Sequence, residues 1–210
     1  FPKSLEKVPF RTFFLCNELE KVTIADGVKI IDWQAFMWCR KLSEIQLPDS
    51  MQIIGSAAFY KCQSLNYIHI PYGVEKIWDY AFSESGLVEI NLPDTIIKIE
   101  KACFLLCYNL KSIVLPANLK TIEKSLFLDC DKLEIVKLPQ QLERIKESAF
   151  TYCSSLRNLD LPASLRKIEE LYSIGLESIR IPRSMKELGR ICGCEELKEV
   201  YIENPVKLLD

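Results

Sequence analysis

A 23-residue phrase recurs along nearly the whole chain, which has 210 residues. In each copy a Phe is followed three residues later by a Cys, then by a Leu and two more apolar residues, and in most copies by a Pro. The six most regular copies contain the pairs Phe13–Cys16, Phe36–Cys39, Phe59–Cys62, Phe104–Cys107, Phe127–Cys130 and Phe150–Cys153. A fixed period of roughly 20–50 residues is typical of solenoids. This period limits the possible fold more than any other feature of the sequence.

Each copy predicts one coil of such a solenoid. The Leu-x-x-apolar-x-apolar run places its last two apolar residues on one face of a strand, and the Pro ends that strand because it has no N–H to donate. A second apolar pair, three and six residues after the Pro, lines the return path. The Ala-Phe-x-x-Cys spacing suits a short turn of α- or 3₁₀-helix. Nine parallel strands are expected, beginning at Leu19, Leu42, Leu65, Leu87, Leu110, Leu133, Leu156, Leu176 and Leu197.

Three copies depart from the regular phrase. The copy at Leu87 is one residue short and lacks the Cys, with Ser85 nearby. The copy at Leu176 is shorter still and lacks both the Phe and the Cys, whereas the copy at Leu197 keeps Cys194 but lacks the Phe. The array is therefore expected to mix 23-residue repeats with shorter ones, down to a 20-residue unit.

The repeated unit resembles the BspA-like class of bacterial leucine-rich repeats, in the Pro that closes the strand, the Ala-Phe-x-x-Cys turn and the 23-residue period. The resemblance covers residues 2–205. It implies a curved, right-handed α/β solenoid with a parallel sheet on its concave face. It also implies a secreted or cell-surface protein of Bacteroides-type bacteria that serves in adhesion or protein binding. The opening FPKSLEKVPF has no signal-peptide pattern, so the location follows from the resemblance alone.

The chain is expected to form one domain over residues 1–210, because the repeats follow one another without a linker. Phe1, Pro2, Leu5 and Val8 match the second half of a coil, so the chain begins in the middle of a repeat. Terminal repeats of a solenoid usually need a polar cap. We therefore expect the natural protein to continue before Phe1.

The cysteines are expected to form an inward column of thiols that fill space. Seven of the nine occupy one repeat position: Cys16, Cys39, Cys62, Cys107, Cys130, Cys153 and Cys194. Free Cys behaves as a small hydrophobe with a weak S–H donor, whereas zinc needs four convergent ligands. Disulfides between neighbouring strands stay open as an alternative, although parallel Cβ directions suit them poorly. Cys103 takes a position that is Ala elsewhere, and the Cys192-x-Cys194 pair is a weak metal signal for which a structural role is expected.

The sequence contains no constellation typical of an enzyme. His69 is the single His and is expected to face solvent, which leaves little for a Ser-His-Asp site or a His-pair metal site. The formal net charge of −2 gives no strong attraction to nucleic acids or acidic membranes, and no run of eighteen apolar residues could span a bilayer. We expect no catalysis, cofactor or metal, no nucleic-acid partner and no direct membrane insertion.

The outward strand positions are the remaining candidates for function. They form two rows of mixed polar, aromatic and apolar residues, as in a protein-binding surface. We expect a protein partner, of unspecified identity, to lie against the concave sheet. Ordinary scatter of surface hydrophobes, glycan binding through scattered Trp and Tyr, and a passive spacer that displays another domain are the alternatives. The predicted contact patch consists of Tyr67, His69, Glu89, Val114, Ile135 and Lys137.

Overall fold

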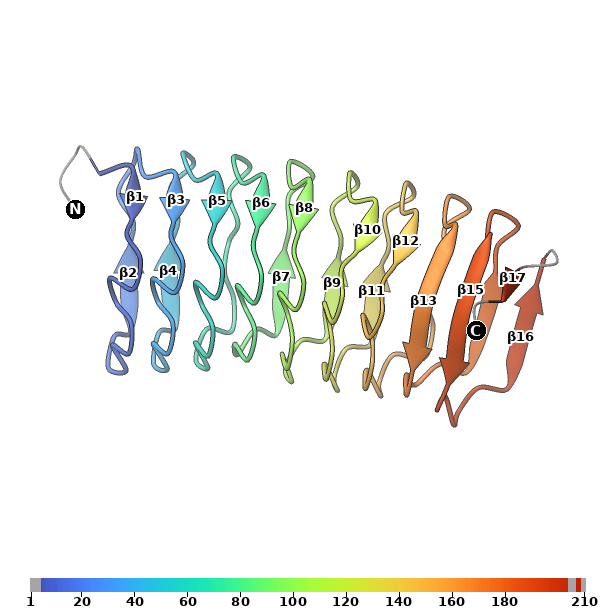
Figure 1. Ribbon diagram of the computed structural model, residues 1–210. Helices are drawn as coiled ribbons and strands as arrows, with labels where there is room; N and C mark the ends of the chain where they lie inside the picture. Colours follow the sequence, from blue (N-terminus) through green and yellow to red (C-terminus); the bar gives the residue numbers. More distant parts are fainter. Residues whose placement is uncertain (1–4, 204–206, 209–210) are drawn as a thin grey trace.

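The coils of the protein stack side by side in one row (Figure 1). This computed structural model describes residues 5–203 and 207–208. Every strand pairing in it is parallel, because each coil repeats the path of the one before. The predicted parallel solenoid of leucine-rich-repeat type is confirmed. The predicted positions of Phe1 and Pro2 lie outside the described residues, while Val8 is buried and pairs with Ile31 of the next coil.

The predicted Leu-x-x-apolar-x-apolar runs form strands in seven of nine copies, on what we call the strand face. No strand forms in the copies at Leu65 and Leu156, where only an isolated bridge joins His69 to Asn91. The strands are β2 (Lys21–Thr23), β4 (Glu44–Gln46), β7 (Glu89–Asn91), β9 (Ser112–Val114), β11 (Ile135–Lys137), β14 (Ser178–Ile181) and β16 (Glu199–Ile202). They alternate as predicted, with Ile90, Ile113 and Val136 buried between exposed or half-buried neighbours.

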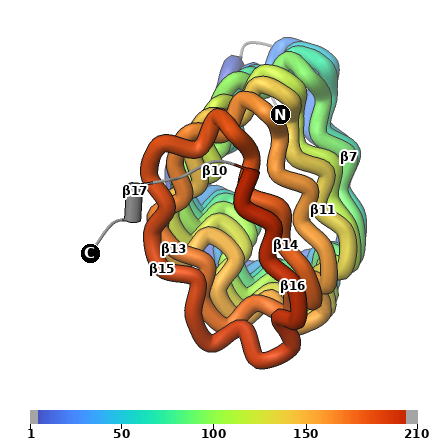
Figure 2. Tube along the Cα trace, turned by 90° about the vertical axis from the view of Figure 1, so that its right-hand side faces the viewer, coloured from blue at the N-terminus to red at the C-terminus, as the bar shows by residue number. Residues whose placement is uncertain are grey.

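A second set of strands, which the sequence did not predict, forms on the opposite side, the return face. It contains β1 (Lys7–Val8), β3 (Ile30–Ile31), β5 (Ile53–Ile54), β6 (Lys76–Ile77), β8 (Lys98–Ile99), β10 (Thr121–Ile122), β12 (Arg144–Ile145), β13 (Lys167–Tyr172), β15 (Glu187–Cys192) and β17 (Lys207–Leu208). Figure 2 shows β7, β11 and β16 on one side of the coil and β13 and β15 on the other. The last apolar residue of each second pair, such as Ile54 or Ile77, is buried between the two faces.

The Ala-Phe-x-x-Cys segments lie on a third side, the turn flank, and the expected helical turns are not confirmed there. No helix occurs in the described part of the chain. Gln34 and Trp38 have φ values of 56° and 68°, which no right-handed helix allows. The N–H groups of Gln34, Phe36 and Trp38 instead donate to carbonyls of the next coil, at 2.8–2.9 Å. The flank is therefore a ladder of β-turns that joins successive coils.

A column of stacked phenylalanine rings runs through the core beside this flank. Seven rings, from Phe13 to Phe150, stack with neighbouring centroids 5.1–5.7 Å apart and interplanar angles of at most 16°. The six rings after Phe13 are buried. Offset stacking adds to the free energy gained by burial, so one side chain per repeat links each coil to its neighbours.

The gaps in the strand-face sheet coincide with changes in coil length. Leu87 follows Leu65 one position sooner than the regular period requires, and Leu176 follows Leu156 three positions sooner. A coil of smaller perimeter cannot stay in register with its neighbour all the way round. On the return face the pairing continues past both short coils, from β5 through β6 to β8 and from β12 through β13 to β15. The misfit therefore falls on the strand face.

Candidate binding surface

The two outward rows of the strand face are set by the register of its strands. His69 is bridged to Asn91, which pairs with Val114, and Val114 pairs with Lys137. In the other row the paired positions are Glu89, Ser112 and Ile135. The structure thus brings the predicted patch residues onto four consecutive coils of one face. Their role in binding stays a prediction.

The patch exposes one aromatic and two aliphatic side chains. Tyr67, Val114 and Ile135 keep 49%, 55% and 53% of their surface exposed. Tyr67, Glu89 and Val114 line a shallow hollow of about 320 Å³. Exposed apolar and aromatic side chains around a hollow among polar groups are typical of a protein contact site.

Polar groups of the patch have no partner of their own. Among the described residues, the side chains of His69, Glu89 and Lys137 make no hydrogen bond or ion pair. In the same rows nearer the start of the chain, Lys21 and Glu44 form an ion pair at 2.8 Å. The patch therefore offers an open donor and an open acceptor next to exposed hydrophobes.

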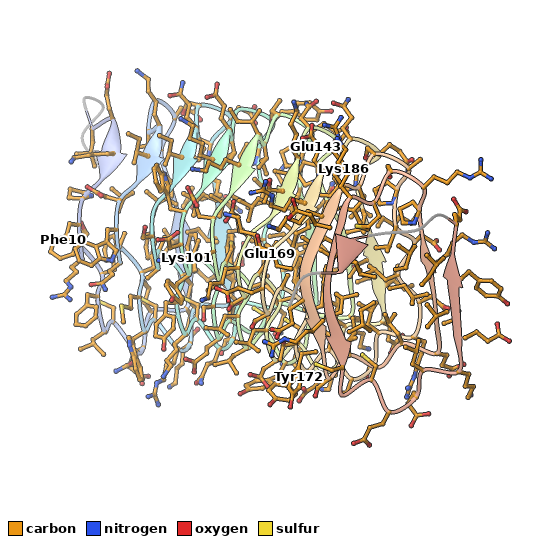
Figure 3. The ribbon with its side chains drawn as sticks, turned by 45° about the vertical axis from the view of Figure 1, so that its right-hand side comes forward. Phe10, Lys101, Glu143, Glu169, Tyr172 and Lys186 are labelled. Atoms are coloured by element: carbon orange, nitrogen blue, oxygen red, sulfur yellow. The ribbon has the colours of Figure 1, made fainter. Side chains whose placement is uncertain are left out.

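The return face is covered by charge pairs between and within coils. Lys120 lies 3.8 Å from Glu143, Lys101 lies 3.9 Å from Asp79, and Lys167 lies 2.9 Å from Glu187. Figure 3 shows many such side chains, with Lys101 and Glu143 labelled. Exposed ion pairs stabilise a fold by about 0–1 kcal/mol each. On this face several charges therefore satisfy one another.

Five cysteines form the buried column that the sequence predicts, and each has a defined hydrogen bond. Each Sγ lies 3.0–3.2 Å from the carbonyl oxygen of a Phe in the preceding coil, as Cys62 does from Phe36. The thiol donates this bond, so the repeat position needs a small residue with a donor. The members of the column are Cys39, Cys62, Cys107, Cys130 and Cys153.

The expected column is wrong at both of its ends. Cys16 is exposed, because no described coil packs over its outer side. Cys194 is half-buried, with its Sγ 4.0 Å from the carbonyl of Leu171, because its coil lacks the Phe that closes the core. In the short coil that lacks the Cys, Ser85 occupies the column position, three residues after Phe82. Its Oγ lies 3.5 Å from Cys107 Sγ.

Burial keeps the core thiols protonated. It raises the pKa of Cys39 and of Cys107 to about 12, and it also raises the pKa of Cys62, Cys103 and Cys130 well above the ordinary value. A thiol needs to be a thiolate to act as a nucleophile or metal ligand. The described residues contain no group of three or more His, Cys, Asp or Glu that could hold a metal ion. They also contain no helix long and apolar enough to cross a membrane.

The repeat pattern predicts no place for several aromatic residues, and the structure groups some of them on the turn flank. Two cations lie over the Trp38 ring, with Arg40 at 4.6 Å and Lys61 at 4.3 Å from its centroid. One coil earlier, Arg11 lies 4.8 Å from the centroid of Phe14. Trp38 and Lys61 both come two residues after the repeat Phe. Position within the repeat is therefore the signal that could have placed them.

Comparison with known proteins agrees with this architecture. A family model for the BspA type leucine rich repeat region matches in six copies, over residues 1–104 and 75–198. No curated protein matches the chain significantly. A leucine-rich repeat protein from Bacteroides ovatus has a similar structure, with a TM-score of 0.84 and 27% identity over 96% of this chain. The T. pallidum leucine rich repeat protein has a TM-score of 0.69 and 32% identity, and the match covers 71% of each chain.

A third similar structure, a leucine-rich repeat protein from Eubacterium ventriosum, has a TM-score of 0.63 and 28% identity over 72% of this chain and 41% of its own. The chain spans 65% of the length of the Bacteroides ovatus protein. The family model covers most of the sequence, and the repeat positions that define it form the observed strands and core. The chain therefore belongs to the BspA-type leucine-rich repeat family.

Proposed function

We propose that this chain is a non-enzymatic protein-binding module of a bacterial secreted or cell-surface protein, with its partner on the strand face. The observation that carries the proposal is the contact patch. There Tyr67, Val114 and Ile135 expose about half of their surface beside polar groups that have no partner among the described residues. The location is supported by membership of the BspA-type family.

The rigidity of the stack favours recognition by this face. Successive coils are joined by backbone hydrogen bonds on the turn flank and on at least one sheet. A surface held in this way loses little conformational entropy when a partner binds, so more of the contact free energy appears as affinity.

Substitution of the patch tests the proposal. The wild-type chain would be screened against an array of purified extracellular proteins, and each partner found would be titrated with Tyr67→Ser and Ile135→Ser. We expect each substitution to weaken binding by roughly 10-fold or more, because truncated aromatic and aliphatic anchors cost the most at interfaces. Ile97→Ser on the return face is the matched control, since Ile97 is 55% exposed.

The outcomes separate the alternatives. Unchanged affinity in both patch variants would show that the partner binds elsewhere. An array without any protein partner would favour the passive spacer. A glycan-binding role is favoured by a separate observation, which lies on another part of the strand face.

A further inference from the structure

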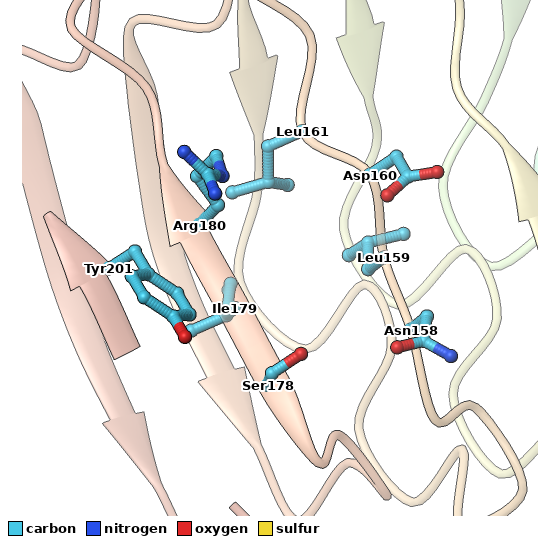
Figure 4. A pocket seen from close by; sticks show the side chains of 8 residues that line it. All are labelled: Asn158, Leu159, Asp160, Leu161, Ser178, Ile179, Arg180 and Tyr201. Atoms are coloured by element: carbon cyan, nitrogen blue, oxygen red, sulfur yellow. The ribbon is translucent and has the colours of Figure 1, made fainter. Parts of the chain in front are cut away.

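A second hollow lies on the strand face, on the three coils that follow the contact patch. Its volume is about 250 Å³, and it opens between the segment 158–161 and β14. Figure 4 shows Asn158 and Asp160 on one side of it and Ser178, Arg180 and Tyr201 on the other. It shares no residue with the contact patch.

The hollow follows from the shortest coil of the array. The coil that begins at Leu156 is three residues shorter than the coil before it, so the two perimeters cannot match. Pairing continues on the return face, where Ile145 of β12 is opposite Ile168 of β13. Among the described residues, no backbone hydrogen bond joins 158–161 to either neighbouring coil. The sheet is therefore parted here, and the peptide groups along the gap stay open to a ligand.

The hollow has an apolar floor and polar walls. Leu159 and Ile179 are buried beneath it and Leu161 is half-buried. Asn158 and Asp160 are exposed, and among the described residues the side chains of Asn158, Asp160 and Ser178 make no hydrogen bond or ion pair. An amide, a carboxylate and a hydroxyl thus present both donors and acceptors across one small space.

The aromatic wall is held in place by its own contacts. Tyr201 is 49% exposed, and Arg180 lies 5.2 Å from its ring centroid. The Tyr201 hydroxyl donates to Glu199 at 2.8 Å, and Arg180 pairs with Glu203 at 3.4 Å. These contacts fix the ring before a ligand arrives, which lowers the entropic cost of binding.

From this geometry we infer that the hollow binds a neutral saccharide, one ring of which enters it. A sugar ring has apolar C–H faces that pack on an aromatic ring, and hydroxyl groups that both donate and accept hydrogen bonds. Tyr201 matches the first property, and Asn158, Asp160 and Ser178 match the second. A neutral sugar is favoured over an anionic one, because Arg180 is already paired with Glu203 and Asp160 brings a negative charge. The rest of a glycan has room to continue along the open sheet.

The inference is tested with a panel of neutral methyl glycosides and their oligosaccharides, followed by saturation-transfer NMR and titration. We expect at least one panel member to bind with a dissociation constant of about 1 mM for a single ring, or tighter for a longer glycan. Tyr201→Ala and Asp160→Ala should each weaken that binding at least 10-fold, whereas Tyr201→Phe should retain most of it. Tyr108→Ala is the matched control, because Tyr108 has the same exposed fraction of 49% and lies on the turn flank.

The folded state of each variant is checked by its thermal unfolding midpoint, which should stay unchanged because these side chains are exposed. Amide shifts of residues 158–161 on adding the sugar provide a readout that does not depend on the variants. The inference is overturned if no saccharide binds, if binding survives in both Tyr201→Ala and Asp160→Ala, or if a peptide displaces the sugar from these amides at lower concentration. Loss of protein binding in the patch variants would be independent of all these results.

Discussion

At the scale of single residues, the column cysteines act as hydrogen-bond donors as well as small core residues. Each thiol donates to a Phe carbonyl one coil away, so its sulfur links two repeats. In a short coil Ser85 occupies this position, and its Oγ lies 3.5 Å from Cys107 Sγ of the next coil. The sequence predicted the inward position of these residues, but it could not show which acceptor they meet.

Two substitutions at one column position separate the contribution of the thiol hydrogen bond to stability from the contribution of the side-chain volume. Cys130→Ala should lower the free energy of unfolding by about 1–3 kcal/mol, because it leaves a cavity and removes the bond to the Phe104 carbonyl. Cys130→Ser keeps a donor and should cost less than Cys130→Ala. Urea denaturation measures both. Cys192→Ala, at an exposed position, is the control and should change stability by less than about 0.5 kcal/mol. Equal losses in the two Cys130 variants would show that the donor contributes nothing.

The raised thiol pKa values predict a loss of stability at alkaline pH. The folded protein holds Cys107 protonated up to a pKa of about 12, whereas the ordinary value is 9.0, so the unfolded chain releases this proton first. The stabilisation of the fold by the protonated Cys107 thiol is complete below pH 9 and is lost as the pH rises towards 12. Cys107→Ser removes this thiol. The free energy of unfolding of the variant should therefore decrease less steeply with pH, by up to about 1.4 kcal/mol per pH unit. Urea titrations between pH 8 and 10.5 measure the slope, and an identical slope in the variant would contradict the assignment.

Native-state labelling gives an independent check on the column. An alkylating reagent under non-reducing conditions should modify Cys16 and Cys192 rapidly, because both are exposed. The six buried thiols should react only when the chain unfolds, with Cys194 between the two groups. Mass spectrometry counts the labels at each position. Buried positions that remain unlabelled even in denaturant would reveal disulfides and defeat the account of free thiols.

At the scale of elements, the sequence predicted one sheet and missed the other. The strand face was predictable because its runs alternate over several residues. Most strands of the return face have two residues, such as Lys98–Ile99. A strand of two residues is too short to show the alternation of apolar and polar residues by which strands are recognised in a sequence. The helical turns were expected because a spacing of three also occurs in successive β-turns. Positive φ at residues such as Trp38 and Lys61 is imposed by contacts between coils, and side chains of this kind give no signal for it.

The candidate sites were predictable to different degrees. Alternation along the strands placed the contact patch on one face, and the structure agrees with that placement. The hollow beside Tyr201 depends on two coils of different perimeter and on a ring two coils away from Asn158. The short spacing after Leu156 was visible in the sequence, but its consequence for the sheet depends on which face keeps its pairing, and that is decided by packing.

Glycines in the short coils test the link between coil length and fit. A Cβ added to Gly86 would lie 2.1 Å from the backbone oxygen of Gln63, so Gly86→Ala should lower stability by more than about 2 kcal/mol. Gly27→Ala is the comparison. A Cβ there meets nothing within 4 Å, and only its φ of +92° is unfavourable, at a cost of about 1–2 kcal/mol. Thermal or urea unfolding ranks the stabilities of the two variants. A smaller loss of stability in Gly86→Ala than in Gly27→Ala would refute the steric account.

At the scale of the whole molecule, stability depends on contacts between neighbouring coils. The phenylalanine column is the most regular of these contacts. Phe82 stacks between Phe59 and Phe104, with centroids 5.4 and 5.7 Å away. Phe82→Ala should lower stability by about 3–5 kcal/mol and divide unfolding into two phases, because the coils on either side lose their link.

Hydrogen exchange measured by mass spectrometry resolves those phases along the chain. Amides near Phe82 should lose protection first, ahead of those near the rings at either end of the column. The exposed Phe10 serves as the control, and Phe10→Ala should leave a single transition. A single cooperative transition in Phe82→Ala would mean that the array does not divide at this ring.

In the part of the chain that the structure describes, the gaps in the two sheets fall at different joints between coils. The strand face is interrupted beside the copies at Leu65 and Leu156, where β5 pairs with β6 and β12 pairs with β13 on the other side. The return face is interrupted between β8 and β10, where β7 pairs with β9. At each of these joints one of the two sheets is therefore continuous, so a force along the solenoid axis meets backbone hydrogen bonds on at least one face. The array can bend where one sheet is interrupted and still transmit tension from one end of the described residues to the other.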